Sequence, residues 1–183
     1  NLDACEENPE LAYQLNAEMP AEMAKHCHSL GIKLVHISTD AVFDGLRGNY
    51  REEDEPNPIG VYAASKLAGE LAVISANPSA LVARVNFYGW SLDGNRSLAE
   101  FFFNNLTADR QVNGFTDVYF CPLLVNDLAP LLVKMLQARL SGLYHVVSRD
   151  CLSKYDFGVA IAGQFGLDAG LIAPASVRDG GLA

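Results

Sequence analysis

The sequence predicts an α/β fold, in which a parallel sheet carries helices on its faces. Two short apolar runs, residues 32–37 and 80–86, have the length and composition of buried strands. Between them, residues 60–76 repeat apolar side chains at helical spacing. Because the connection between the two strands is far longer than a hairpin turn, we expect them to run parallel, with the helix as their crossover.

The first helical segment is expected to begin at Asn8-Pro9. Asparagine is a favoured cap and proline suits the first helical position. Pro20 should interrupt or kink the segment, and Gly31 should end it. Apolar side chains repeat along it at helical spacing: Leu11, Leu15, Met19 and Met23.

The first strand ends at Ser38-Thr39-Asp40, where polar side chains begin. Residues 44–58 are rich in Gly, Asn, Pro and charge, which predicts a loop. The helix over 60–76 follows the loop and precedes the second strand. Its apolar side is formed by Val61, Ala64, Leu67, Ala68, Leu71 and Ala72.

Beyond residue 90 the pattern is looser. Residues 91–97, rich in Ser, Asp, Gly, Asn and Arg, indicate a boundary. We therefore expect residues 1–90 to form the first part and residues 91–183 to form mostly a smaller lobe, with segments that return to the main sheet. The expected later elements are a helix over 98–106, an extended piece over 117–125, a helix capped by Asp127 that runs to about 140, a strand over 142–147 and a helix from Ser153 to about 165.

Composition limits the classes of function. The chain has 183 residues, of which 50% are hydrophobic and 19% are charged, as is typical of a globular protein with a sizeable core. Its net charge of −9 repels phosphate backbones, so we expect no nucleic-acid partner. The sequence has no run of 18 apolar residues, so we expect no membrane span.

The cysteines and histidines predict no metal site. The four cysteines are far apart and form no CxxC pair, so we expect buried or incidental thiols in a reducing, cytoplasmic compartment. His26 and His28 diverge on a helix. We expect His36 and His145 to be core residues with satisfied hydrogen bonds, and the acidic run 51–55 to be a solvated loop. The cysteines are Cys5, Cys27, Cys121 and Cys151.

Tyr62 and Lys66 form the strongest chemical signal. Residues four apart share one face of a helix, and an ammonium beside a phenol favours the phenolate, which lowers the tyrosine pKa. A hydroxyl at the end of the preceding strand, on Ser38 or Thr39, can hold a substrate oxygen against that tyrosine. Such a set transfers a proton to or from a carbonyl or alcohol.

Together, these residues resemble the extended short-chain dehydrogenase/reductase family, in its sugar-nucleotide branch of the dTDP-4-dehydrorhamnose reductase type. The resemblance covers nearly all of the chain. The matching strings are Asn16 in Gln14-Leu-Asn-Ala17, Val35-His-Ile-Ser-Thr-Asp-Ala-Val-Phe-Asp-Gly45, Pro58-Ile-Gly-Val-Tyr-Ala-Ala-Ser-Lys-Leu-Ala-Gly-Glu70, Arg84-Val-Asn-Phe-Tyr-Gly89, Gly142-Leu-Tyr-His-Val146 and Ser153-Lys-Tyr-Asp-Phe157.

The resemblance implies a Rossmann-like fold, incomplete and with a small C-terminal substrate lobe, and NAD or NADP as cofactor. It makes Tyr62 the catalytic acid and places Lys66 on the nicotinamide ribose, where it lowers the Tyr62 pKa. Thr39 would bind the same substrate oxygen, and Asn16 would help to order the catalytic set. The implied cofactor contacts are Ser38, Tyr62, Lys66 and Arg84, and the implied substrate contacts are Thr39, Asp40, Asn86 and Trp90.

Ala41 narrows the implied reaction. Dehydratases of this superfamily typically carry Thr-Asp-Glu at the strand end, and Ala41 replaces the glutamate here. We therefore expect NAD(P)H-dependent reduction of a 4-keto nucleotide sugar. Two alternatives stay open. One is a nucleotide-sugar epimerase. The other is a non-catalytic regulatory subunit, because Tyr50-Arg-Glu-Glu-Asp54 and Ser153-Lys-Tyr155 also resemble the β subunit of methionine adenosyltransferase.

The glycine-rich turn that holds the cofactor pyrophosphate in this family is not found. Gly163, Gly166 and Gly170 are crowded together, but they close a predicted helix instead of opening one. Against the family pattern, we expect the chain to begin after the fourth strand and to stop before the last segment. A sheet without its first strands leaves an apolar edge open. We therefore expect poor stability, self-association through that edge or altered packing.

Overall fold

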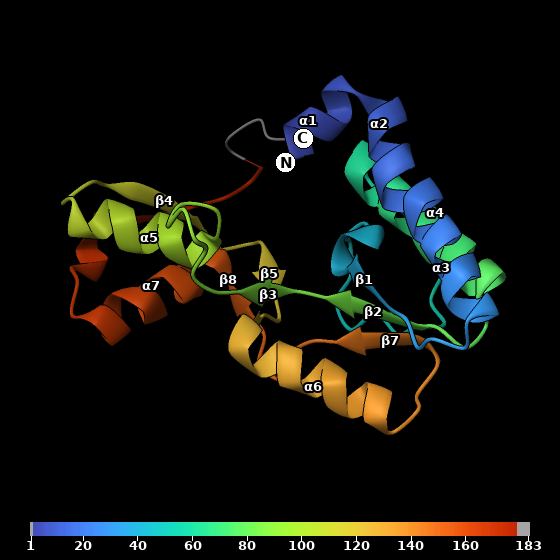
Figure 1. Ribbon diagram of the computed structural model, residues 1–183. Helices are drawn as coiled ribbons and strands as arrows, with labels where there is room; N and C mark the ends of the chain where they lie inside the picture. Colours follow the sequence, from blue (N-terminus) through green and yellow to red (C-terminus); the bar gives the residue numbers. More distant parts are fainter. Residues whose placement is uncertain (1, 179–183) are drawn as a thin grey trace. The chain divides into compact units, whose positions relative to one another are not determined.

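The computed structural model describes residues 2–178 of the chain (Figure 1). The chain divides into two compact units. The first unit contains the residues up to Val85 together with Ala129–Val146. The second unit contains Asn86–Leu128 and the residues from Val147 onward. The chain thus leaves the first unit after its second strand and returns to it for its third.

The first unit is built on a three-stranded parallel sheet with the strand order β1-β2-β7. Its strands are β1 (Val35–Thr39), β2 (Leu81–Val85) and β7 (Gly142–Val146). The central strand β2 is buried over its whole length, because it has a neighbour on each side and helices on both faces. In register, Val35 lies opposite Leu81, and Leu81 lies opposite Gly142. The parallel strands expected from the sequence are confirmed.

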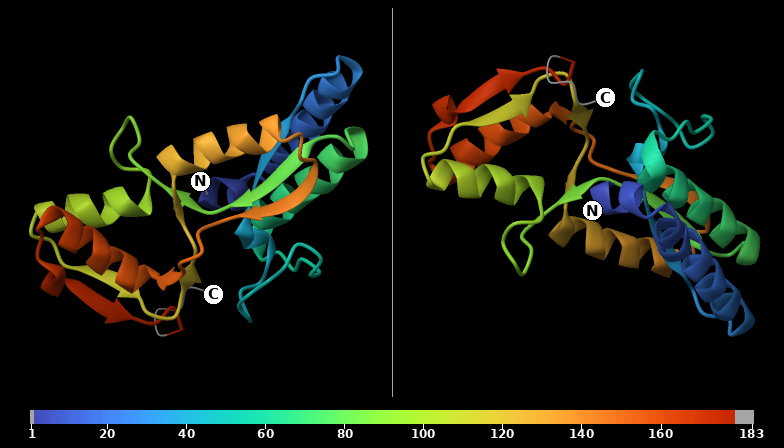
Figure 2. Two further views of the ribbon diagram at one scale, coloured as in Figure 1. Left: turned by 90° about the horizontal axis from the view of Figure 1, so that it is seen from below. Right: turned by 90° about the horizontal axis from the view of Figure 1, so that it is seen from above.

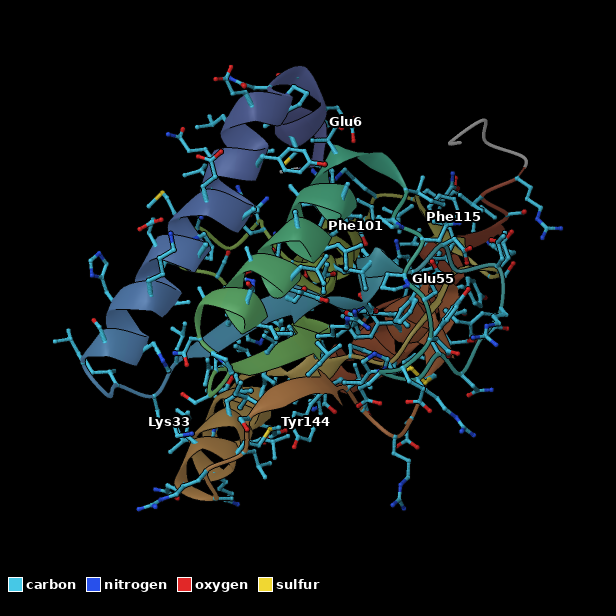
Figure 3. All side chains as sticks on the ribbon, turned by 90° about the vertical axis from the view of Figure 1, so that its right-hand side faces the viewer. Glu6, Lys33, Glu55, Phe101, Phe115 and Tyr144 are labelled. Carbon is cyan, nitrogen blue, oxygen red and sulfur yellow. A yellow bond between two sulfur atoms is a disulfide. The ribbon has the colours of Figure 1, made fainter. Side chains whose placement is uncertain are left out.

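Helices cover both faces of this sheet. Helix α4 (Gly60–Ala76) packs on β1 and β2, and α3 (Met19–Ser29) lies beside α4, as Figure 3 also shows. Helix α6 (Val125–Gln137) lies on the opposite face (Figure 1). The core between α3, α4 and the sheet is formed by Ala24, Val73, Ala80 and Val82.

The N-terminal helical stretch is broken where the sequence predicted an interruption. Helix α1 (Leu2–Glu7), which was not predicted, precedes α2 (Pro9–Tyr13), and a π-helical segment, η1 (Gln14–Glu18), connects α2 to α3. The side chain of Asn8 caps α2 by accepting a hydrogen bond from the Leu11 amide at 3.1 Å. Pro20 lies in the first turn of α3, where a missing N–H costs least.

The side that α4 buries differs from the apolar side seen in its sequence. Leu71 is 64% exposed. Gly69 allows the close packing, because a Cβ atom there would lie 2.0 Å from the backbone oxygen of Asn16. Hydrophobic periodicity failed here because two of the buried side chains are polar. The buried residues are Ala63, Ser65, Gly69, Glu70 and Val73.

The second unit packs two helices against short strand pairs (Figure 2). Helix α5 (Leu98–Thr107) begins with a capping box, in which Ser97 and Glu100 bond each other's backbone amides. Helix α7 (Lys154–Phe165) contacts α5 so closely that a Cβ atom on Gly158 would lie 2.6 Å from the ring of Phe102. The core of the unit is formed by Ala99, Phe102, Leu106, Phe157, Ile161, Ala162 and Ile172.

Three two-stranded pairs complete this unit. The parallel pairs are β3 (Phe87–Tyr88) with β6 (Leu123–Leu124) and β4 (Val112–Phe115) with β9 (Ile172–Ala175). The antiparallel pair is β5 (Tyr119–Phe120) with β8 (Leu152–Ser153). A short 3-10 turn, η3 (Ala169–Leu171), precedes β9.

Two predictions about helix ends have different outcomes. Gly166 ends α7 with φ 64°, in the left-handed region that favours glycine, which confirms the predicted helix end. The prediction that Asp127 caps the helix that runs to about residue 140 is wrong. This helix, α6, begins at Val125, and Asp127 lies inside its first turn. Its carboxylate there still suits the positive end of the helix dipole.

The prediction of four unpaired thiols is also wrong. Cys121 and Cys151 form a disulfide, with their Cα atoms 4.1 Å apart, while Cys5 and Cys27 are free. The pairing follows from strand register: Phe120 lies opposite Leu152 in the antiparallel pair, so the next residues on each strand, the two cysteines, also oppose each other. The two cysteines are 30 residues apart, so the sequence has no short spacing such as CxxC that would indicate the pair.

Strand β1 has an open edge. It pairs with β2 on one side, and none of residues 2–178 pairs with its other side. On the same unit, Met19, Met23, Leu30 and Ile32 are exposed and line a groove of about 520 Å³. The open edge expected from the sequence is therefore present in the described part of the chain.

Reduction of the Cys121–Cys151 bond is expected to destabilise the second unit. Closing a chain loop of 30 residues lowers the entropy of the unfolded chain, which corresponds to about 3 to 4 kcal/mol of unfolding free energy. Denaturant unfolding with and without a reductant measures the difference, and Cys27→Ser, which removes a free thiol, is the matched control. Four reactive thiols in the unfolded, unreduced chain would contradict the disulfide.

Candidate functional site

The structure brings Thr39 and Tyr62 together at the carboxyl end of β1. Thr39 is the last residue of β1 and is buried, and Tyr62 lies in the first turn of α4. Their side chains share a hydrogen bond. The Thr39 hydroxyl also accepts from the Ala41 amide at 3.1 Å and lies 3.3 Å from a carboxylate oxygen of Asp40. Parallel sheets of open α/β proteins bind ligands at this end of their strands.

The pKa of Tyr62 moves in the direction opposite to the one expected. Burial raises the pKa of the phenol above its ordinary value, although the hydrogen bond with Thr39 lowers it in part. The expectation that Lys66 lowers this pKa is therefore wrong for the structure as described. In this environment the phenol keeps its proton at neutral pH and is suited to act as an acid.

Lys66 is held by the backbone of β1. Its ammonium donates to the carbonyl oxygen of Ile37 at 2.6 Å. Burial lowers the pKa of Lys66, and the charge of Glu70 opposes this effect. An ammonium has three N–H donors, and the bond to Ile37 uses one of them. Within the described residues the others are available to a ligand hydroxyl.

Glu70 is a site residue that the sequence analysis missed. Its carboxylate is almost completely buried and forms an ion pair with Arg84, whose Nη2 atom donates to Oε2 at 2.7 Å. The Nε atom of Arg84 lies 2.9 Å from Oε1. Ser38 donates its hydroxyl to Oε1 at 2.5 Å. The position of Glu70, two helical turns after Tyr62 and one after Lys66, was the signal available in the sequence.

These contacts do not support the expected cofactor contacts of Ser38 and Arg84. Both side chains are buried, and their polar groups bind Glu70. Arg84 also lies 3.3 Å from Nε2 of His145 and stacks over the ring of Phe43. The two residues belong to the internal support of the site, because a buried guanidinium with these partners has little surface left for a ligand.

The acidic run 51–55 is the loop that the sequence predicts, exposed except at Asp54, whereas the expectation of satisfied hydrogen bonds at His36 is corrected. Glu52, in the acidic run, accepts a hydrogen bond from the backbone amide of His145 at 2.8 Å, so the loop is tied to β7 at this point. His36 is buried as expected, but its Nε2 atom has no hydrogen-bond partner. Burial and the nearby Lys66 ammonium lower the pKa of His36 to about 4.

Asn16 is connected to helix α4 through Ser65. It lies in the π-helical segment η1, and such segments occur often at functional sites. Its amide nitrogen donates to the Ser65 hydroxyl at 3.0 Å, and that hydroxyl donates to the carbonyl oxygen of Tyr62 at 2.9 Å. Asn16 is therefore placed to order the first turn of α4, while its role in the reaction stays a prediction.

Asn86 and Trp90 belong to the second unit. Asn86 follows β2 directly, and its carbonyl oxygen accepts from the Leu123 amide at 2.9 Å. Trp90 is 51% exposed and packs edge-on against Phe103 and Phe165. It lines a cavity of about 410 Å³ whose polar lining comes from Ser148, Asp150 and Gln164. A binding role for either residue stays a prediction.

The residues of the first unit fit the nicotinamide end of a dinucleotide cofactor. Tyr62 and Lys66 present a phenol and a partly free ammonium beside Thr39 at one strand end. The crowded glycines do not provide a pyrophosphate cradle, since Gly166 ends α7 and Gly170 follows it in a turn. Among residues 2–178, no group of His, Cys, Asp or Glu could hold a metal ion, and no helix is long and apolar enough to cross a membrane.

Comparison with known proteins identifies close relatives. The family model of the RmlD substrate binding domain matches residues 1–180. A probable low-salt glycan biosynthesis reductase of Haloferax volcanii is 38% identical over 183 residues, a match that covers 98% of this chain and 61% of that protein. Methionine adenosyltransferase 2 subunit beta of Bos taurus is 32% identical over 179 residues, with coverages of 94% and 54%.

A solved structure confirms the Rossmann-like fold. The dTDP-4-dehydrorhamnose reductase of Bacillus anthracis, solved in complex with NADP, matches with a TM-score of 0.91 and 29% identity. The match covers 99% of this chain and 64% of that one. The chain thus spans 54% to 64% of the length of these three proteins.

Acidification is expected to destabilise the first unit through His36. Its pKa is about 4 in the folded chain and 6.5 as a free group. Because the unfolded chain takes up this proton first, the unfolding free energy falls as the pH drops from 6.5 toward 4, by about 3 kcal/mol in total. The unfolding free energy, measured with urea at several pH values, should depend less steeply on pH in His36→Leu than in the wild type. Equal pH dependence in both proteins would contradict this account.

Proposed function

The chain belongs to the RmlD substrate binding domain family, and on this premise we propose that the protein reduces the 4-keto group of a nucleotide-linked deoxysugar with NADH or NADPH. The observation that carries the proposal is the hydrogen bond between Thr39 and Tyr62 at the carboxyl end of β1. It joins a hydroxyl that can hold a ketone oxygen to a phenol that can protonate it.

A reduced nicotinamide supplies the hydride in such a reaction. Tyr62 contributes the proton, since its raised pKa keeps the phenol protonated at neutral pH. Thr39 donates to the same oxygen and orients it. Lys66, anchored on the Ile37 carbonyl, presents its remaining N–H donors to the ribose.

Ala41 supports reduction over dehydration. It follows Asp40 in the short helix η2 (Asp40–Val42), and its methyl group cannot act as the base of an elimination. Asp40 lies beside Thr39 and is the residue we propose for a contact with the sugar.

The second unit has a candidate ligand-binding cavity of its own. Trp90 offers an exposed aromatic face at a cavity of about 410 Å³, and aromatic faces stack well on flat or apolar rings. We propose Trp90 and Asn86 as substrate contacts of this unit. The negative charge of the chain does not oppose a single anionic ligand in a local site.

A regulatory subunit is the second candidate function. The similarity to methionine adenosyltransferase 2 subunit beta, at 32% identity, favours it. A protein of this kind would bind a catalytic partner and turn over no keto sugar. An epimerase on the same scaffold would show turnover without net consumption of reduced cofactor.

We also propose that the chain self-associates through the open edge of β1. The edge is flanked by exposed apolar side chains of α3, which favour burial against another surface.

The cellular compartment of the protein stays a prediction. We expect the cytoplasm, and the disulfide between Cys121 and Cys151 is the observation that argues against it.

Self-association is expected to raise the molar mass of the chain in solution above 19.8 kDa. Light scattering coupled to size-exclusion chromatography measures it over a range of concentrations. The pair Met19→Glu/Met23→Glu should shift the mass toward the monomer, because it places charge on the groove beside the edge. A monodisperse monomer that unfolds cooperatively would contradict this proposal.

Replacing the catalytic acid is expected to abolish most of the turnover. In the complete polypeptide encoded by the gene, Tyr62→Phe should lower kcat by a factor of about 100 to 10,000, as for other lost general acids. Consumption of reduced cofactor with a nucleotide-linked 4-keto sugar measures the rate. The matched control is Tyr119→Phe, which removes an exposed phenol hydroxyl from the second unit.

The pH dependence gives an independent check on the same residue. An acid must carry its proton, so the reductive rate should stay level through neutral pH and fall only above the ordinary tyrosine pKa of about 10. Near-full activity of Tyr62→Phe would overturn the assignment. A wild-type polypeptide that turns over no keto sugar but copurifies with a catalytic partner would favour the regulatory role.

A further inference from the structure

Three side chains on one face of α4 contact three consecutive residues of β1. Tyr62, Lys66 and Glu70 are spaced four residues apart, so they form one stripe along the helix. Tyr62 bonds to the side chain of Thr39, Lys66 to the carbonyl oxygen of Ile37 and Glu70 to the hydroxyl of Ser38. Helix α4 is thereby bonded to one backbone carbonyl and two side chains at the end of β1.

Glu70 is the most constrained member of this stripe. Its side chain is 2% exposed, and that of its partner Arg84 is 3% exposed. Both carboxylate oxygens are occupied: Oε1 accepts from Ser38 and from Nε of Arg84, and Oε2 accepts from Nη2 and Nε of Arg84. Each bond involves an ionised group, which makes it shorter and stronger than a neutral one.

The same contacts connect Glu70 to the reacting end of the site. Ser38 precedes Thr39 directly, so a carboxylate that fixes the Ser38 side chain also limits the position of the next peptide unit. Arg84 occupies the neighbouring strand β2 and lies opposite Ser38 in the sheet register. Glu70 therefore joins α4, β1 and β2 at one point, one residue before the hydroxyl of Thr39.

Stability alone does not explain a buried ion pair at this place. Moving two charges out of water is costly, and replacing such a pair by apolar side chains of similar volume is often neutral or stabilising. A geometric function is the alternative, and the location next to Thr39 supplies one. Errors of about 1 Å in the placement of reacting groups can cost about 100-fold in rate.

We propose that Glu70 is a positioning residue: through Ser38 it fixes Thr39 against Tyr62, and through its place on α4 it sets the height of Tyr62 and Lys66 over the strand end. This inference rests on the proposed reductase function for its effect on rate. Glu70 itself touches neither substrate nor cofactor in this account, and it acts only through the residues it holds.

The decisive variant is Glu70→Met/Arg84→Met, which replaces both charges by apolar chains of similar size. We expect its melting temperature to stay close to that of the wild type, whereas kcat in the complete polypeptide should fall by about 10- to 100-fold with KM nearly unchanged. Ser38→Ala should lower kcat by a similar factor. When Ser38→Ala is combined with Glu70→Met/Arg84→Met, the fold-loss in kcat should be smaller than the product of the two separate fold-losses, because both changes act through one connection.

Asn77→Ala is the matched control for stability. Asn77 is a fully buried polar residue at the C-terminal end of α4, away from Tyr62. Its loss should lower the melting temperature and leave kcat and KM unchanged. A wild-type kcat in the folded Glu70→Met/Arg84→Met variant would overturn the proposal. If that variant does not fold, a wild-type kcat in Ser38→Ala would overturn it equally.

A second readout separates this proposal from the proposed function. In the 183-residue chain labelled with ¹³Cζ-tyrosine, the Tyr62 resonance, assigned with Tyr62→Phe, reports its titration without any turnover. The Tyr62 titration should shift in Glu70→Met/Arg84→Met and stay unchanged in Asn77→Ala. Absence of turnover in the wild type with a shifted titration would refute the reductase function alone. An unshifted titration would refute the positioning role.

Discussion

The attachment of helix α4 to strand β1 is the constraint on which the candidate site depends. A helix and a strand do not share a repeat, so side chains from both can meet at one point only if the helix is held at a fixed height and rotation. Small residues let the other side of α4 pack closely on η1: Gly69 lies against the backbone of Asn16, and Ser65 is completely buried. Polar contacts from Tyr62, Lys66 and Glu70 then fix the alignment.

Burying charged and polar side chains around β2 is unfavourable unless they find hydrogen-bond partners. A buried carboxylate and guanidinium remain charged only where hydrogen bonds replace water, and the Glu70–Arg84 pair has such bonds from Ser38 and a contact with His145. His36 shows the opposite case, because it is buried beside Lys66 with an unpartnered ring nitrogen and keeps its neutral form. The first unit thus contains a buried charged pair that is held by hydrogen bonds and, near the site, a neutral histidine with one unpartnered ring nitrogen.

Much of the fold could be predicted from the sequence, because local signals were strong where elements begin and end. Asn8, Ser153 and Gly166 mark helix ends by rules of capping and backbone conformation, and the helix over 60–76 was predicted at its observed bounds.

Side-chain burial was harder to predict from the sequence. Periodicity marks apolar residues as inside, and it cannot show that α4 buries Glu70 and exposes Leu71. The disulfide depends on the register of two short strands distant in sequence, which no local pattern encodes. For the site, motif and resemblance named Thr39, Tyr62 and Lys66, whereas the pKa of Tyr62 depended on burial, which only the structure shows.

The central claim is that the strand end of the first unit reduces a ketone with hydride from a nicotinamide. Transfer of a label tests it most directly. The complete polypeptide is incubated with a nucleotide-linked 4-keto-6-deoxysugar and nicotinamide cofactor that carries deuterium at the transferable position. The account predicts one deuterium at C4 of the recovered sugar alcohol, seen by mass spectrometry and by loss of the C4 proton signal in NMR. Recovery of unlabelled sugar, or of a sugar changed only in configuration, would contradict it.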